Sequence, residues 1–157
     1  MNLCQERFPL IMGHEPAVET AIDDTSDWVC LKNAAGVYII VATYGGAGVT
    51  DFVLSVHEST AGSGTTAITT VFPIWVNADT ATSDVMVRQT DAAGYTVDNA
   101  LQDNQLVAFY IDASILSEGY DWIQLGSSGG FATNYATVLY LMDGERYQQV
   151  TPPTAIA

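Results

Sequence analysis

The sequence is built from short apolar runs separated by clusters of glycine, serine and other turn residues. The run 51–60 shows the pattern most clearly, because Phe52, Leu54 and Val56 alternate with mostly polar side chains. A period of two places successive side chains on opposite faces of a strand, so this run predicts a half-buried β-strand. The run 36–44 is apolar on both faces, which is typical of a central strand.

Runs of this kind recur at near-regular spacing along the chain. They cover residues 28–32, 36–44, 51–60, 68–76, 84–90, 106–112, 121–125 and 135–142. Helical periodicity is nearly absent, with room for single turns at 97–103 and 113–118. Pro73 cannot donate to a sheet ladder, so we place it at an edge or a bulge. We predict an all-β fold, a single-domain antiparallel β-sandwich that is jelly-roll-like and has about eight strands.

The two ends of the chain differ from its middle. Residues 1–27 contain prolines and an acidic stretch but little periodicity, and residues 148–157 contain Pro152 and Pro153 and no charge. We therefore divide the chain into an N-terminal arm (1–27), a β-sandwich domain (28–147) and a C-terminal tail (148–157). Such ends either fray in the isolated monomer or become ordered as extended arms against neighbouring subunits.

Charge excludes one class of partner. The 157 residues include 18 acidic and only 4 basic side chains, for a formal net charge of −14. A surface of this sign repels phosphate backbones, so we expect no nucleic-acid partner. No apolar run reaches about 18 residues, so we expect no membrane partner. The N-terminus lacks the apolar core of a signal peptide, which favours synthesis in the cytoplasm, and Cys4 and Cys30 form no disulfide or metal motif.

The sequence gives no sign of an enzyme. Residues 126–130 match the G-x-S-x-G nucleophile elbow, but no histidine follows Ser128, and we interpret the segment as a turn. The two histidines are His14, in the N-terminal arm, and His57, which we expect to face solvent from the polar side of its strand. Neither belongs to a zinc-binding pattern. We predict no catalytic residue, no cofactor-binding residue and no cofactor.

Two binding chemistries remain as alternatives to inert surface. Acidic side chains gather in three loops, at Asp23, Asp24 and Asp27, at Asp79 and Asp84, and at Asp91, Asp98 and Asp103. Calcium binds oxygens from such loops, but no calcium-loop motif is present, so we favour a solvated negative surface and predict no metal site. Three tryptophans, Trp28, Trp75 and Trp122, are candidates for a carbohydrate platform, although their positions in β runs favour core packing.

Five stretches resemble, in order and spacing, motifs of one family of virion proteins. The stretch 28–33 resembles an opening V-S-L-K-N, 73–80 resembles W-x-N-x-D-T, and 136–141 resembles a closing V-S-A-L-Y-I-L strand. Residues 109–116 and 119–123 together resemble E-V-D-P-x-x-L followed by G-F-D, with Ala113 where the family has proline, and Arg146-Tyr147 lies near the end. The resemblance covers 28–147, and the family is the tailed-bacteriophage capsid decoration (cement) proteins of the jelly-roll type.

The resemblance implies a function without catalysis. It implies a structural protein on the capsid exterior of a virion that is made in the host cytoplasm. Its partners would be the phage major capsid protein and itself, as a homodimer or homotrimer. It would bridge neighbouring major capsid subunits and stabilise the expanded head. The contact elements would be residues 1–27, 148–157 and the long loop 91–104, so we expect deletion of residues 1–20 to weaken attachment and leave the fold intact.

Two other functions remain open. One is an adhesion or binding module on the virion surface, Ig-like or carbohydrate-binding, and the other is a low-copy head or tail completion protein.

Overall fold

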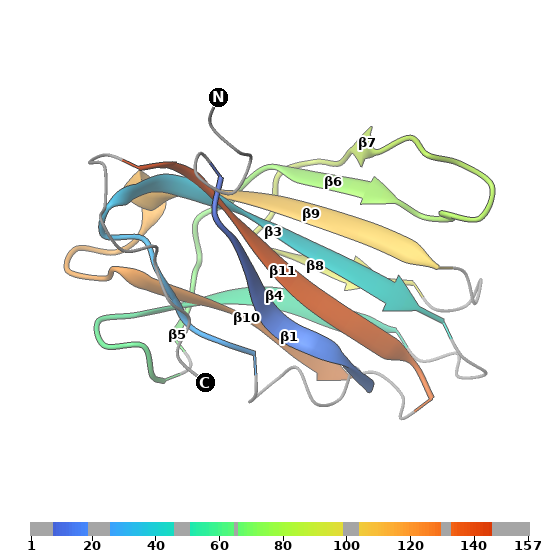
Figure 1. Ribbon diagram of the computed structural model, residues 1–157, viewed down its shortest axis with the longest axis horizontal. Coiled ribbons are helices and arrows are strands. Elements are labelled where there is room, and N and C mark those ends of the chain that lie inside the picture. The colour runs from blue at the N-terminus through green and yellow to red at the C-terminus, as the bar shows by residue number, and fades with distance from the viewer. Residues whose placement is uncertain are drawn as a thin grey trace.

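The computed structural model describes residues 8–18, 26–45, 51–64, 66–98, 104–129 and 133–145. They form two antiparallel sheets packed face to face (Figure 1). The first sheet has the strand order β1 (Leu10–Val18), β11 (Tyr135–Glu145), β3 (Ala34–Tyr44), β9 (Gln105–Asp112), β6 (Ile74–Asn77) and β7 (Val87–Arg88). The second has the order β2 (Val29–Cys30), β10 (Trp122–Gly129), β4 (Phe52–Ser59) and β5 (Thr66–Ala67), with β8 (Gly94–Val97) also paired to β4.

The strand pairing is that of a jelly roll. Strands near the two ends of the chain pair with each other, and the pairs then move inward: β1 with β11, β2 with β10, β3 with β9, and β4 with β8. These pairs are distributed over two sheets, as in an eight-stranded jelly roll. Strands β5, β6 and β7 are inserted between β4 and β8, and β6 and β7 extend the first sheet beyond β9. The predicted all-β sandwich is confirmed.

Alternating side chains from both sheets fill the space between them. In β3 the inward residues Val37, Ile39 and Val41 are fully buried, and the inward residues of β9 and β4 continue the same layer. Phe72 meets Phe109 edge to face, with ring centroids 5.6 Å apart. The alternation predicted for residues 51–60 therefore holds on its apolar side.

Residues 10–18 correct the predicted N-terminal arm, because they form β1, an edge strand of the first sheet. The sequence pattern did not predict this strand, because two register shifts interrupt its alternation. They lie between Met12 and His14 and between His14 and Ala17 of β1, which pairs with β11. Pro16 lies in the second irregularity, a position that proline tolerates in an edge strand. Residues 1–7, 19–25 and 146–157 lie outside the described residues, and with them most of the predicted arm and the whole predicted tail.

Other boundaries differ from the predictions in ways that the backbone explains. Strand β6 starts only at Ile74, because the preceding residue Pro73 has no N–H to donate to the ladder. The Pro73 carbonyl still accepts the Tyr110 N–H (3.1 Å). Strand β8 lies inside the predicted long loop 91–104. The turn predicted at 113–118 contains a 3₁₀ helix, Ala113–Ile115, that begins where the Asp112 carboxylate accepts the Ser114 N–H (2.8 Å).

One hydroxyl group joins the two sheets. Tyr140 on β11 is fully buried, and its hydroxyl accepts the N–H of Leu125 on β10 (2.9 Å). Gly13 makes room for the ring, since a Cβ at this position would lie 2.2 Å from Cε2 of Tyr140. Ser26 covers the same edge of β10 by donating its hydroxyl to the Leu125 carbonyl. These contacts satisfy β10 groups beyond the point where β2 ends.

Candidate interaction surface

Residues 126–129 of the G-x-S-x-G segment form a strand and not the predicted turn, and Gly130 lies outside the described residues. Residues 126–129 belong to β10 and pair with β4 from Ser55 to Phe52. Glycine at 126 is required by a neighbour across the ladder, because a Cβ there would lie 2.6 Å from Cε1 of His57. The glycines and serines that predicted a turn are instead the small side chains that let an imidazole ring lie over the sheet.

His57 is buried, which corrects its predicted solvent-facing position. Only 8% of it is exposed, and its Nε2 lies 3.3 Å from the hydroxyl oxygen of Ser55. His14 is also buried, on β1. Burial raises the pKa of the nearby Asp27 carboxyl, and the electrostatic effect of His14 opposes this shift only in part. The two histidines lie on different sheets and form no common site.

The acidic loops organise turns. Asp79 accepts the Ala81 N–H (2.9 Å) and the Thr82 hydroxyl (2.6 Å), and these hydrogen bonds lower the pKa of its carboxyl. Asp91 pairs with Arg88. Asp23, Asp24 and Asp103 lie outside the described residues. Within the described ranges, no group of three His, Cys, Asp or Glu side chains is placed to hold a metal ion.

The tryptophans are spread over different parts of the fold. Trp28 is buried, as predicted, whereas Trp75 and Trp122 are only half-buried. The guanidinium carbon of Arg88 lies 5.0 Å from the centre of a Trp75 ring, an arrangement in which cation and ring attract. Trp122 lies beside Gly62. They do not form a shared carbohydrate platform.

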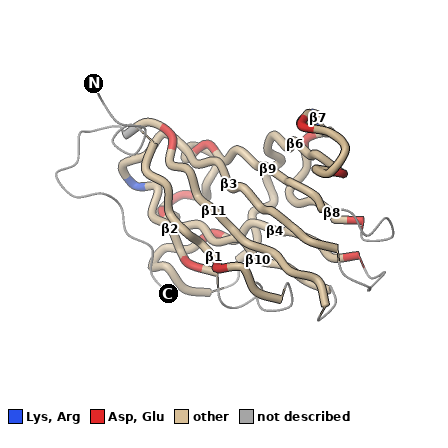
Figure 2. The backbone as a smooth tube through the Cα atoms, turned by 45° about the vertical axis from the view of Figure 1, so that its right-hand side comes forward, with Lys and Arg blue, Asp and Glu red and all other residues tan. Residues whose placement is uncertain are grey.

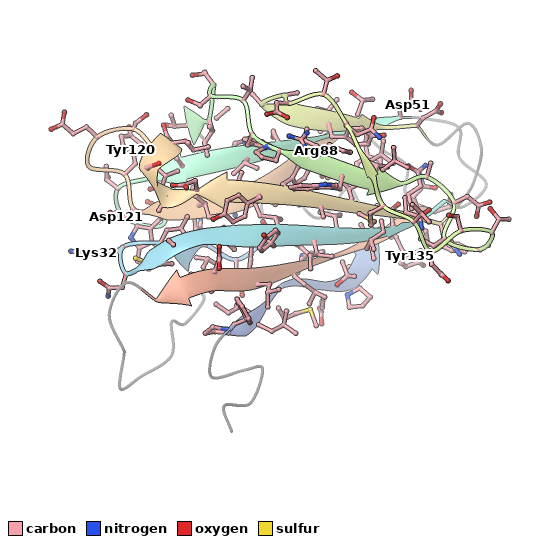
Figure 3. The ribbon with its side chains drawn as sticks, turned by 90° about the horizontal axis from the view of Figure 1, so that it is seen from above. Lys32, Asp51, Arg88, Tyr120, Asp121 and Tyr135 are labelled. Carbon is pink, nitrogen blue, oxygen red and sulfur yellow. The ribbon has the colours of Figure 1, made fainter. Side chains whose placement is uncertain are left out.

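The largest unusual feature is the solvent side of the first sheet, which we call the outer face. Its strands alternate between buried inward side chains and half-buried or exposed outward ones. Apart from Glu15 on the edge strand β1, Arg88 on β7 and the border residues Asp112 and Asp143, the outward residues are uncharged and largely apolar: Leu10, Met12, Tyr38, Ile40, Ala42, Tyr44, Trp75, Leu106, Ala108, Tyr110, Tyr135, Thr137, Leu139 and Leu141. Figure 3 looks onto these strands, which lie side by side in the order of their pairing.

Strand register sorts the outer face into rows that cross the sheet. The Ile40 row runs from Met12 through Leu139, Ile40, Ala108 and Trp75 to Arg88. On one side of it lies the Tyr38 row, with Leu10, Leu141, Tyr38 and Tyr110, followed by the Gly36 row, with Asp143, Gly36 and Asp112. On the other side lie the Ala42 row, with Thr137, Ala42 and Leu106, and the Tyr44 row, with Tyr135 and Tyr44.

Charge is confined to the borders of this surface. On the central strands β11, β3 and β9, the Tyr38, Ile40 and Ala42 rows contain no charged residue. The exposed Glu15 lies on the edge strand β1, Arg88 lies on the opposite edge strand β7, and Asp143 and Asp112 flank Gly36 at one end of the strands. Tyr110 donates its hydroxyl to Asp143 (3.0 Å), and burial together with this hydrogen bond raises the pKa of Tyr110 to about 12. In Figure 2 the central stretches of β3, β9 and β11 are free of acidic colouring.

The other end of the outer face is hollowed. Pro16, Asn104 and residues of the Ala42 and Tyr44 rows line a depression of about 280 Å³. Tyr44 and Tyr135 face each other across the ladder and are 56% and 49% exposed. Figure 3 shows Tyr135 at the end of the sheet opposite Lys32.

The sequence contained the signal for this surface. Residues 36–44 are apolar on both faces, and β3 is a central strand as predicted, between β11 and β9. Its second apolar face, however, is not covered in the described structure. By contrast, the outward side of β4 and β10 is polar around Ser55, Gln124 and Ser128, with Val53 as an exposed apolar residue.

The fold and this surface define a jelly-roll sandwich with one large uncharged sheet face. No model of a protein family, no curated protein and no solved structure matches the chain. Within the part of the chain that the structure describes, no helix is long and apolar enough to cross a membrane.

Proposed function

We propose that the protein is a structural virion protein, a capsid decoration (cement) protein on the outer surface of a phage head. It bridges neighbouring major capsid subunits and stabilises the expanded head. The observation that supports an assembly role is the outer face, because apolar patches of this extent mark protein interfaces. A fold alone does not assign a function. The proposal that the partner is a phage head rests on the ordered motifs of residues 28–147.

Charge supports a place outside the shell. The net charge of −14 would be repelled by packaged DNA inside a head and is tolerated on its exterior. Figure 2 shows acidic residues mainly at strand ends and in the segments that connect strands. We propose that the protein binds the expanded shell more tightly than the unexpanded one. Such preferential binding shifts the equilibrium towards the expanded state.

The shell-contacting elements are proposed in segments of the chain outside the paired strands. The family resemblance led us to propose this role for residues 1–27, 148–157 and 91–104. Of these, β1 is part of the sheet and β8 is paired to β4, so the proposal now concerns the rest of these segments. The outer face remains available for a separate contact.

Co-sedimentation with capsid shells tests the proposal. Purified protein is mixed with unexpanded and with expanded shells, and bound copies are counted. We expect saturable binding of hundreds of copies, stronger on expanded shells. Absence of binding to both kinds of shell would refute a decoration role.

Exposed aromatic residues favour a second candidate, an adhesion module on the virion surface. Tyr44 and Tyr135 border the hollow of about 280 Å³, and aromatic rings with polar tips suit partners that are both apolar and wet. A glycan array with the full chain separates the two functions. Specific glycan binding that Tyr44→Ala abolishes would favour adhesion, and a blank array counts against it.

A further inference from the structure

We propose that two copies of this chain bind each other through their outer faces. The dimer is isologous, with its two-fold axis crossing the strands at the Ile40 row. This inference concerns the isolated protein and does not rest on the phage head.

The size of the outer face is sufficient for such a contact. At about 3.3 Å per residue and about 4.8 Å between strands, it extends about 20 Å in each direction. With the side chains at its rim, two copies would cover roughly 1,000 Å² in total, at the lower limit for specific interfaces.

The order of the rows makes the outer face complementary to itself. In an isologous contact, each residue pair occurs twice, with the roles of the copies exchanged. An axis across the strands at Ile40 places the Tyr38 row of one copy against the Ala42 row of the other. It also places the Gly36 row against the Tyr44 row. The strands of the two copies then run antiparallel, compatible with aligned packing of twisted sheets.

Side-chain sizes match in this register. Tyr38 and Tyr110 form a bulky pair with ring centroids 4.7 Å apart, and Tyr38 is 36% exposed. The Ala42 row opposite them has smaller side chains and borders the hollow of about 280 Å³. A cavity of about 150 Å³ holds a benzene molecule, so the hollow has room for a tyrosine ring of the second copy.

Polar groups match at the ends of the contact. The Tyr44 row brings the hydroxyls of Tyr44 and Tyr135 towards Asp112 and Asp143 of the second copy. A carboxylate has about four acceptor positions, so Asp143 can accept another hydroxyl besides that of Tyr110. Hydrogen bonds of this kind offset the cost of removing the carboxylates from water.

Charge favours a second copy over an oppositely charged partner. Two chains of net charge −14 repel each other, so they can associate only where carboxylates are absent from the contact centre. The three central rows of the outer face meet this condition on β11, β3 and β9, and the exposed Glu15 lies at the rim, on the edge strand β1. A basic partner would instead be expected to bind a surface rich in carboxylates.

Sedimentation equilibrium of the full chain tests the dimer. We expect a species of twice the 16.8 kDa chain mass at micromolar concentration. Ile40→Glu places two carboxylates against each other on the axis and should raise the dimer Kd at least about 100-fold. Val53→Glu is the matched control, since it puts the same charge on the opposite sheet at an exposed strand position (41%) and should leave Kd unchanged. Circular dichroism verifies that both variants fold.

Charge pairing tests the position of the axis. Ile40→Lys and Ile40→Glu chains, each weakened alone, should form a heterodimer when mixed, because residue 40 meets its own counterpart. A monomer at all concentrations, a trimer, or a dimer that Ile40→Glu does not weaken would overturn the proposal. Shell binding is measured separately, so a monomer that still binds shells refutes the dimer alone.

Discussion

At the scale of single residues, the sandwich depends on Tyr140. Its ring is fully buried between the sheets, and its hydroxyl accepts the Leu125 N–H that no strand partner reaches. Burial raises the pKa of Tyr140 to about 12, and the hydrogen bond from the Leu125 N–H acts in the opposite direction. The sequence marked 135–142 as a strand but gave no sign that one of its side chains spans both sheets.

Tyr140→Phe should lower the free energy of unfolding by about 1–3 kcal/mol, because the buried Leu125 N–H loses its acceptor. Chemical denaturation measures this, with Tyr38→Phe on the outer face as the control expected to change stability little.

At alkaline pH, the stabilities of the wild-type chain and of the Tyr140→Phe variant should respond differently. The unfolded chain releases the Tyr140 proton near pH 10.0 and the folded chain only near pH 12. The contribution of this proton to stability is therefore complete below about pH 10 and is lost as pH rises through about 12, by roughly 2–3 kcal/mol in all. Tyr140→Phe should show a shallower decline, and an unchanged decline would contradict the assignment.

Gly126 illustrates a residue whose role the sequence could not show. Gly126→Ala would put a methyl group 2.6 Å from Cε1 of His57, so we expect a loss of about 1–3 kcal/mol in unfolding free energy. Ser128→Ala on the same strand is exposed and should cost less than about 0.5 kcal/mol. Adding His57→Ser to Gly126→Ala should recover part of the loss, and strict additivity of the two changes would refute the contact.

At the scale of elements, the predictable strands were those with regular alternation or an uninterrupted apolar run. Residues 51–60 show a period of two and correspond closely to β4, and the continuous apolar run 106–112 corresponds closely to β9. Strand β1 was missed because two register shifts interrupt its alternation, and the second half of β10 because Gly126–Gly129 has the composition of a turn. Pairing partners were not predictable, since strand contacts join residues far apart in the chain.

Deletion of residues 1–18 tests the corrected role of β1. Its loss uncovers the edge of β11, so we expect a lower unfolding temperature and aggregation through the exposed strand. Deletion of residues 1–7, which removes no part of β1, is the control. Equal unfolding temperatures for both deletions would show that β1 does not contribute to stability and would contradict its corrected role.

At the scale of the whole molecule, the arrangement of charge matters more than its amount. Carboxylates border the outer face and leave its centre uncharged. Composition predicted a repulsive surface but could not locate the gap in it, because strands distant in sequence contribute its rows. Such a gap permits association that long-range repulsion still opposes.

The dimer Kd should therefore fall as salt concentration rises. Ions screen the repulsion between two chains of net charge −14 and leave the apolar contact largely unaffected. Sedimentation at several sodium chloride concentrations measures this. A Kd that rises with salt would indicate a contact held by charge pairs instead of the outer face.

Quantitative mass spectrometry of purified virions tests the central claim most directly. The copy number of this chain is measured relative to the major capsid protein. The account predicts hundreds of copies per particle, in fixed proportion to the capsid lattice. A few copies would favour a head or tail completion protein, and complete absence from the virion would contradict the proposed function.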